Sequence, residues 1–276
     1  MRKFYATMMV FAGLLMFAAS AYSTQYIYGI HWWESGADQI MNAKKGWDVE
    51  IINADGIHNP GNLEGDKAKL RNIIQEGFTP IIRINWGWFE TIPRPDTVSY
   101  AEYANRCAMI IDELYNHLGD GLRVKWFQIG NEYNLDYEYQ PVGDGYGAPA
   151  SVYNQYFNTV YNKVKSTVPG AGNIKVLVGP VANWAPNRPS DGYAGNPPVP
   201  AQGFYYDRYY KAVVQGIPQC DGYAIHTYGG HRNIALPHGL GGIYFGVDNN
   251  LAYYPGLDTS NTSGFNSFKV LMRINI

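Results

Sequence analysis

Six apolar runs, rich in β-branched residues, alternate along the chain with segments of helical periodicity. The runs are nearly continuous rather than strictly alternating in polarity, which is typical of strands buried on both faces. The predicted strands span residues 26–30, 49–53, 80–85, 124–130, 174–181 and 222–227.

Apolar residues at helical spacing predict the intervening helices. Residues 100–118 are the clearest case, since Tyr103, Cys107, Ile110 and Leu114 recur on one face and Gly119 closes the segment. The other predicted helices span residues 66–77, 151–168 and 204–214. Strand–helix alternation of this kind indicates a parallel sheet.

Such a sheet is either open and doubly wound or closed into a barrel. No Gly-x-Gly-x-x-Gly opens a helix after the first strand, and the glycines of residues 143–147 lie in a long loop, which disfavours dinucleotide binding. Polar and aromatic residues instead follow every strand, as the active face of a TIM (β/α)8 barrel requires. They are His31–Trp33, Asp55, Trp86–Trp88, Asn131–Glu132, Asn183–Trp184 and His226–Tyr228.

We therefore predict an α/β fold of the TIM-barrel type, formed by residues 24–276 as one domain. The six strands use the chain up to about residue 228, whereas a complete barrel has eight. Beyond them lie loop-like sequence, residues 229–264, and one more apolar stretch, residues 268–276. The expectation is an incomplete barrel with six of eight strand–helix units, truncated before strand seven.

The N-terminal residues have the pattern of a secretory signal. Arg2 and Lys3 precede an apolar run from Met8 to Ala19. Residues 19–21 form an A-x-A-like cleavage site, with residues 21–23 as an alternative register. We expect residues 1–23 to be a signal peptide and the protein to be secreted, to the extracellular space or the periplasm.

Composition narrows the classes of partner. The formal net charge is −2, so neither nucleic acid nor an anionic membrane is an expected partner. We expect a monomer when the barrel is complete. Aromatic residues make up 15% of the chain, with 24 Tyr and 7 Trp. This excess fits either sugar stacking or a core filled with aromatic rings.

The segment Lys125 to Glu132 carries the most specific chemistry. It reads as a short apolar strand that ends in Gly130-Asn131-Glu132. A glutamate at the rim of a core is partly shielded from water, which raises a carboxyl pKa and allows proton donation near neutral pH. The alternative is a solvated glutamate just beyond a strand.

In this context, Gly130-Asn131-Glu132 resembles the acid/base motif of clan A glycoside hydrolases, the (β/α)8-barrel group that includes cellulases and mannanases. The resemblance covers residues 26–228 and includes His226-x-Tyr228 after strand six. It implies that Glu132 is the general acid/base and that Asn131 binds a sugar 2-hydroxyl. It also implies that His226 and Tyr228 line the site and orient the nucleophile.

The family's second carboxylate, a glutamate at the end of strand seven, has no match here. No glutamate follows Glu138, and the later acids are Asp144, Asp191, Asp207, Asp221, Asp248 and Asp258. Two hypotheses follow. The chain is an inactive fragment of a secreted, retaining hydrolase of β-linked glycans, or it is a degenerate barrel that binds carbohydrate without cleaving it.

Further positions are candidates for binding an oligo- or polysaccharide. His31 and Trp32 follow strand one, and Trp86, Trp88 and Trp184 are possible stacking platforms, with core packing as the alternative. Arg83 lies within an apolar strand, where a buried arginine requires a partner. That partner is either a carboxylate at the barrel mouth or a core salt bridge.

The remaining polar residues predict little. Glu138 lies in a loop and is expected to be solvated. The six histidines show no metal spacing, so we expect neither a metal nor a cofactor. Cys107 and Cys220 permit a disulfide in an exported protein, but two buried thiols are favoured.

Overall fold

A computed structural model describes residues 29–31, 46–139, 147–182 and 206–225. In these residues one parallel sheet of six strands has the order β1-β2-β3-β4-β5-β6. The strands are β1 (Gly29–His31), β2 (Trp47–Asn53), β3 (Thr79–Asn85), β4 (Trp126–Ile129), β5 (Lys175–Val178) and β6 (Gly222–Tyr223). All six predicted strands are thus confirmed, and each strand pairs with the strand that follows it in the sequence. Closure into a barrel stays a prediction, and residues 1–23 lie outside the described part.

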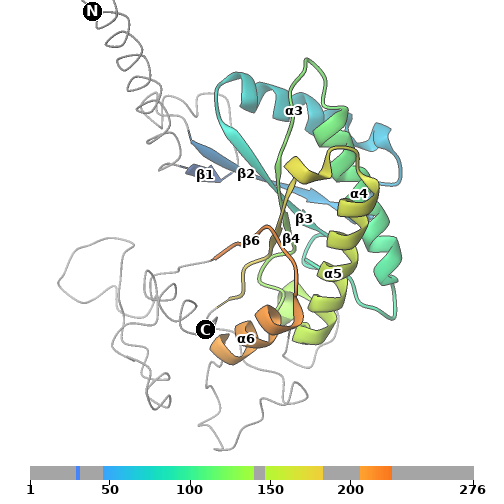
Figure 1. The fold of residues 1–276 in the computed structure, drawn as a ribbon, viewed down its shortest axis with the longest axis vertical. Coiled ribbons are helices and arrows are strands. Elements are labelled where there is room, and N and C mark those ends of the chain that lie inside the picture. The colour runs from blue at the N-terminus through green and yellow to red at the C-terminus, as the bar shows by residue number, and fades with distance from the viewer. Residues whose placement is uncertain (1–28, 32–45, 140–146, 183–205, 226–276) are drawn as a thin grey trace, which may run out of the picture.

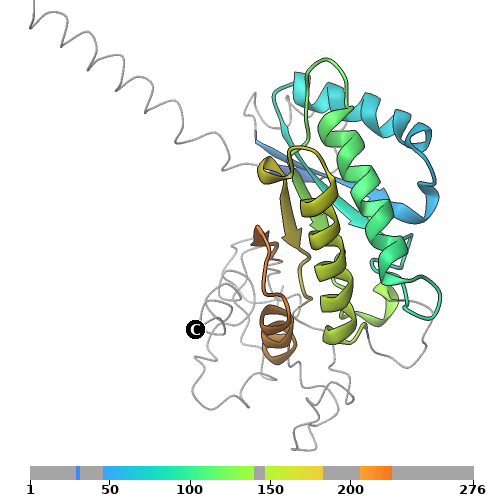
Figure 2. The same cartoon turned by 45° about the vertical axis from the view of Figure 1, so that its right-hand side comes forward.

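The four predicted helices are also confirmed, with ends that differ by two residues or fewer. They are α3 (Glu64–Gln75), α4 (Tyr100–Asn116), α5 (Ala150–Thr167) and α6 (Tyr206–Gly216). Figures 1 and 2 show these helices along one side of the sheet, and α4 packs on α5 as α5 packs on α6. Ser99 caps α4, because its side chain accepts the backbone N–H of Glu102 at 3.1 Å. No helix in the described residues combines the length and apolarity that a membrane crossing needs.

The two faces of the sheet differ. The helix-covered face forms the core, and its strand residues are fully buried: Ile82, Ile84, Phe127, Ile129, Val176 and Val178. On the opposite face, here called the inner face, Ile51, Arg83 and Gln128 lie side by side on β2, β3 and β4. Ile51 and Arg83 are only half-buried. Gln128 is buried on the inner face, so the described strands are covered on both sides, but less completely there than on the helix-covered face.

Tyr153 of α5 joins the carboxyl ends of two strands. Its buried hydroxyl group donates to the carbonyl oxygen of Ile129 at 2.9 Å and accepts the N–H of Gly179 at 2.7 Å. The ring of Tyr133 stacks on that of Tyr153, with 3.5 Å between the ring centroids. The hydroxyl group of Tyr133 donates to the Gly179 carbonyl at 3.2 Å. Helix α5 thereby fixes β4 and β5 at the edge where the candidate site begins.

Both cysteines are free thiols, as favoured from the sequence. Cys107 is buried in α4, whereas Cys220 is half-buried. Burial raises the pKa of the Cys107 thiol, which makes this residue an unreactive part of the core.

We predict that Tyr153→Phe destabilises the protein through two unmatched backbone groups. The change keeps the ring but leaves the Ile129 carbonyl and the Gly179 N–H buried without their shared partner. Each such group costs about 1–3 kcal/mol. Urea unfolding measures the loss. Tyr161→Phe is the control, since the ring of Tyr161 makes its contacts with Phe157 and Lys165, and its cost should stay within about 0.5 kcal/mol.

Asp48 gives the fold a pH dependence. This β2 residue is fully buried, and burial, with the nearby negative charge of Glu50, raises its pKa to about 7. Between about pH 4, its ordinary value, and pH 7, the folded state therefore binds more protons than the unfolded state. The free energy of unfolding should fall as the pH rises through this window.

Urea unfolding at several pH values from 4 to 8 tests this expectation. Asp48→Asn cannot ionise, so its stability should fall less steeply with rising pH than that of the parent protein. The slope should not vanish, because burial also raises the pKa of Asp66 and Glu90. Asp136→Asn, on an exposed residue, should leave the slope unchanged. An Asp48→Asn slope equal to that of the parent would contradict the assignment.

Candidate functional site

Glu132 lies just beyond β4, at the carboxyl edge of the sheet. It is only 6% exposed, so the alternative of a solvated glutamate is wrong. Its backbone N–H donates to the carbonyl oxygen of Pro180, after β5, at 2.8 Å. The two segments meet so closely that a Cβ atom on Gly179 would lie 2.4 Å from the Ile129 oxygen. Glycine is therefore required at that position, and the glutamate is held between two strand ends.

The backbone of Glu132 is in the left-handed region, with φ of 43°. Such a conformation is unfavourable for a residue with a side chain, by about 1–2 kcal/mol. The flanking residues offset this cost. The side chain of Asn134 exchanges two hydrogen bonds with the backbone of Ala182, at 2.7 and 2.8 Å, and the Tyr133 carbonyl accepts the N–H of Ala148 at 2.7 Å.

Three asparagines bring unsatisfied acceptors to this edge: Asn53, at the end of β2, Asn85 and Asn131. Asn131 is 4% exposed and Asn85, the last residue of β3, is 6% exposed. The side-chain oxygen of each has no hydrogen-bond partner among the described residues. A buried amide oxygen without a donor is costly in a folded protein. A ligand hydroxyl group could supply the missing donor.

Glu138 corrects the expectation of a solvated side chain. It ends a short 3-10 helix, η3 (Asp136–Glu138), and is half-buried. Burial raises its pKa to about 7, the negative charge of Glu132 adds to this, and the positive charge of Arg83 opposes it. Of the two alternatives for Arg83, this electrostatic interaction favours a carboxylate at the strand ends. Glu132, Glu138 and Arg83 thus form one electrostatic cluster.

Trp86, after β3, is packed rather than open. Its ring meets Tyr103 edge-on at 6.1 Å, and the guanidinium group of Arg106 lies over it at 4.9 Å. Both contacts favour the core-packing alternative over a stacking platform. In the same loop, Trp88 is 65% exposed and Phe89 is 60% exposed, which makes them the more accessible aromatic rings.

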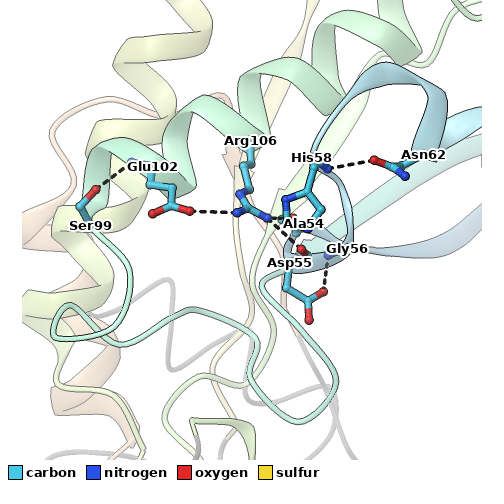
Figure 3. Close-up of polar contacts among 8 residues, drawn as sticks. All are labelled: Ala54, Asp55, Gly56, His58, Asn62, Ser99, Glu102 and Arg106. Atoms are coloured by element: carbon cyan, nitrogen blue, oxygen red, sulfur yellow. Dashed lines mark hydrogen bonds and ion pairs between the residues drawn. The ribbon is translucent and has the colours of Figure 1, made fainter.

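Arg106 also anchors the loop after β2. Figure 3 shows its guanidinium group, from α4, donating to the carbonyl oxygens of Ala54 and Asp55 at 3.1 and 2.8 Å and pairing with Glu102 at 2.9 Å. The Asp55 carboxylate points away from Arg106 and accepts the N–H of Gly56 at 2.7 Å. The loops after β2 and β3 are therefore fixed by the same helix.

Several predicted site residues lie outside the described part of the chain: Trp32, Trp184, His226 and Tyr228. Of His31 the structure gives only its place at the end of β1. Among the described residues, no group of three or more His, Cys, Asp or Glu side chains is arranged to hold a metal ion.

Asn85 and Glu138 were not among the predicted site residues. Asn85 could have been found from the sequence, because it is the last residue of an apolar strand. Asn131 and Glu132 lie in a similar position, just beyond the end of β4. No sequence signal identifies Glu138, since it lies in a loop and two of the residues that act on it, Arg83 and Thr91, are distant in sequence. The site supported by the structure therefore consists of Asn85, Asn131, Glu132, Glu138 and Arg83.

We predict opposite responses to glycine at Glu132 and at a helical position. Glycine relieves a left-handed backbone, so Glu132→Gly should be more stable than Glu132→Ala by about 1 kcal/mol. Gln155, exposed within α5, is the matched control, where alanine should be favoured over glycine by about 1 kcal/mol. Urea unfolding of the four variants measures both differences. If alanine is the better residue at both positions, Glu132 is not strained.

No family model matches this chain, and no curated protein matches its sequence. Among solved structures, a fungal β-1,4-galactanase aligns with 12% identity and a TM-score of 0.40. The alignment covers 67% of this chain and 52% of the galactanase chain, so this chain matches only about half of that protein. This weak likeness to a glycoside hydrolase is too low to assign a fold or an activity, and the function proposed below rests on the site itself.

Proposed function

We propose that this protein is an exported hydrolase of β-linked glycans in which Glu132 is the general acid/base. The observation that carries the proposal is a buried glutamate with a left-handed backbone at the carboxyl end of a parallel strand. Unfavourable backbone conformations persist where the surrounding structure enforces them, and they cluster at functional sites. The carboxyl ends of parallel strands are also where α/β folds place their active sites.

The chemistry follows from what a shielded carboxyl group can do. As an acid, Glu132 would protonate the glycosidic oxygen as the bond to the sugar breaks, and as a base it would then activate water. In the retaining mechanism that we propose, a second carboxylate about 5–5.5 Å away attacks the sugar. No glutamate follows Glu138 in this sequence, so the group in that role is not identified.

Substrate contacts would come from the polar edge around Glu132. The unsatisfied oxygen of Asn131 is suited to accept a sugar hydroxyl group, and so is that of Asn85. Arg83 lies on the inner face and would orient the carboxylates. We keep His31, Trp32, Trp86, Trp184, His226 and Tyr228 as proposed contacts from the sequence. For Trp86, the packing against Tyr103 and Arg106 makes a supporting role the better proposal.

A second candidate is a barrel that binds carbohydrate without cleaving it. The specific observation in its favour is the lack of any glutamate after Glu138. In this case Asn131 and Asn85 would still bind sugar hydroxyl groups, whereas Glu132 would accept a hydrogen bond and transfer no proton.

Binding and cleavage assays on soluble β-glucan, mannan and xylan separate these proposals. We expect the chain to be retarded in affinity electrophoresis by at least one glycan. Release of new reducing ends is expected only from a version of the protein that supplies the second carboxylate. Glu132→Ala should lower turnover by about 10²–10⁴-fold, the usual contribution of a positioned proton donor. Substrates with good leaving groups should be less affected in the first step, because their leaving group needs little protonation.

Gln155→Ala, on the exposed surface of α5, is the control and should change neither binding nor turnover. Binding without any release of reducing ends would favour the carbohydrate-binding candidate. Release that continues undiminished in Glu132→Ala would exclude Glu132 as the acid. If no β-glycan is bound or cleaved, both proposals are wrong.

A further inference from the structure

The turn after β3 presents two aromatic rings to solvent. In the described part of the chain three large apolar side chains are exposed, and two of them, Trp88 at 65% and Phe89 at 60%, are consecutive. The third, Tyr137, is 44% exposed and lies in the loop after β4. Large aromatic side chains gain free energy from burial, so two that stay exposed side by side indicate a surface that binds a partner.

The backbone of this turn holds the two rings outward. The N–H of Gly87 donates to the Glu90 carbonyl at 2.8 Å, and the N–H of Glu90 donates to the Gly87 carbonyl at 3.4 Å. Trp88 and Phe89 are therefore the tip of a tight two-residue turn. Glu90 also forms an antiparallel bridge with Tyr139, so the loop after β4 supports the base of the turn.

Phe89 has an unfavourable backbone for its residue type. Its φ is 61°, in the left-handed region, at a turn position where glycine or asparagine is usual. Neither burial nor local backbone preference therefore selects an aromatic residue here. Conformations of this kind persist where the surrounding structure enforces them, and they cluster at functional sites. The two observations together indicate that the rings serve binding rather than stability.

The two rings form a corner. Their centroids lie 6.2 Å apart, and their planes meet at 73°. Planes at this angle cannot both stack on one flat ligand, so one ring offers its face while the other borders it. Trp88 is the better stacking face, because its ring is larger and more exposed, and its indole N–H is a hydrogen-bond donor.

This corner lies at the same edge of the sheet as Glu132. The turn begins just beyond Asn85, the last residue of β3, whose side-chain oxygen is an unsatisfied acceptor. Thr91, which follows the turn, donates its backbone N–H at 2.9 Å and its hydroxyl group at 3.3 Å to the Glu138 carbonyl. The corner is thereby joined through backbone contacts to the loop that carries Glu132.

The exposed area suits a sugar better than a protein. An aromatic side chain has about 150–250 Å² of surface, so the observed exposures leave roughly 200–300 Å² of Trp88 and Phe89 open. A stable interface with a second copy or another protein takes about 800 Å² from each partner. A single sugar ring, with its apolar C–H face, needs far less.

We propose that Trp88 and Phe89 form an aromatic subsite that binds a further sugar unit of the glycan, with the Trp88 ring stacked on the C–H face of the sugar. The face of an aromatic ring carries negative partial charge, so it attracts C–H groups in addition to the apolar contact. The inference rests on the proposed function for the class of ligand, but it concerns binding and requires no proton transfer.

Affinity electrophoresis in gels that contain soluble β-glucan, mannan or xylan tests the subsite. Trp88→Ala should lower the association constant for the retained glycan by about three- to tenfold, the usual contribution of an aromatic contact. Trp88→Phe keeps a ring and should retain most of the affinity. Gln155→Ala on α5 is the control and should bind as the parent does. Equal retardation of the parent and Trp88→Ala would overturn the proposal.

Urea unfolding separates binding from stability. Because Trp88 is exposed, the midpoint of Trp88→Ala should match that of the parent. Phe89→Gly should have a higher midpoint than Phe89→Ala, since glycine relieves the left-handed backbone, yet both lack the ring and should bind the glycan equally weakly. If retardation instead follows the midpoint in these variants, the ring acts only through the fold and has no place in the subsite.

NMR of the chain with ¹⁵N-labelled tryptophan shows where the glycan binds. The indole signals of Trp88 and Trp126 are assigned by their loss in Trp88→Phe and Trp126→Phe. Short oligosaccharides of the retained glycan should shift the Trp88 signal. Trp126 begins β4 at the opposite edge of the sheet, where it packs edge-on against Trp47 at 5.3 Å, and its signal should not move. An unchanged Trp88 signal would overturn the proposal.

The outcome is separable from that of the proposed function. Glycan binding that does not depend on Trp88 would reject the subsite and retain the proposed function. Binding that depends on Trp88, with cleavage that does not depend on Glu132, would retain the subsite and reject Glu132 as the acid. A parent dimer that Trp88→Ala converts to a monomer would assign the rings to self-association and overturn the subsite. If the parent binds no β-glycan, both proposals are wrong.

Discussion

The hydrogen bonds of the Tyr153 hydroxyl group are the constraint on which the site depends. They join Ile129, at the end of β4, to Gly179, just beyond β5, and they hold both against α5. Because the two strand ends are fixed at this separation, the N–H of Glu132 reaches the Pro180 carbonyl. The strained backbone of Glu132 is one consequence of this junction between the ends of β4 and β5. The core maintains the strain because the free energy gained by its packing is far larger.

The abundance of tyrosine in the chain has a structural explanation in the described residues. A buried tyrosine needs a partner for its hydroxyl group, and these side chains repeatedly find a backbone carbonyl. Tyr103 donates to Ile84 at 3.2 Å, Tyr156 to Val98 at 2.6 Å and Tyr209 to Ala148 at 2.6 Å. Each bond ties a helix to a strand end or a loop. Composition alone could not distinguish this use from sugar stacking, for which the exposed ring of Trp88 is the better candidate.

Periodicity predicted the elements well because strands and helices are encoded locally. The apolar spacing of residues 100–118 and the cap at Ser99 suffice to define α4. Position in the sequence also predicted Glu132 at a strand end. It failed for Glu138, since the fold of that loop is set by Thr91, which lies 47 residues earlier in the chain. The sequence also left two roles open for Trp86, core packing and sugar stacking. The residues that cover its ring, Tyr103 and Arg106, come from the following helix.

Arg83 links the energetics of the sheet to the chemistry of the site. An arginine within an apolar strand is unfavourable unless negative charge lies within reach, and the carboxylates beyond β4 supply that charge. Those carboxylates in turn would repel each other without it. Burial and the negative charge of Glu132 raise the pKa of Glu138 to about 7, and the positive charge of Arg83 opposes this rise. The turn at Leu135 and the contact with Thr91 hold the backbone of Glu138, so the charge of its carboxyl group can change near neutral pH while the loop stays in place.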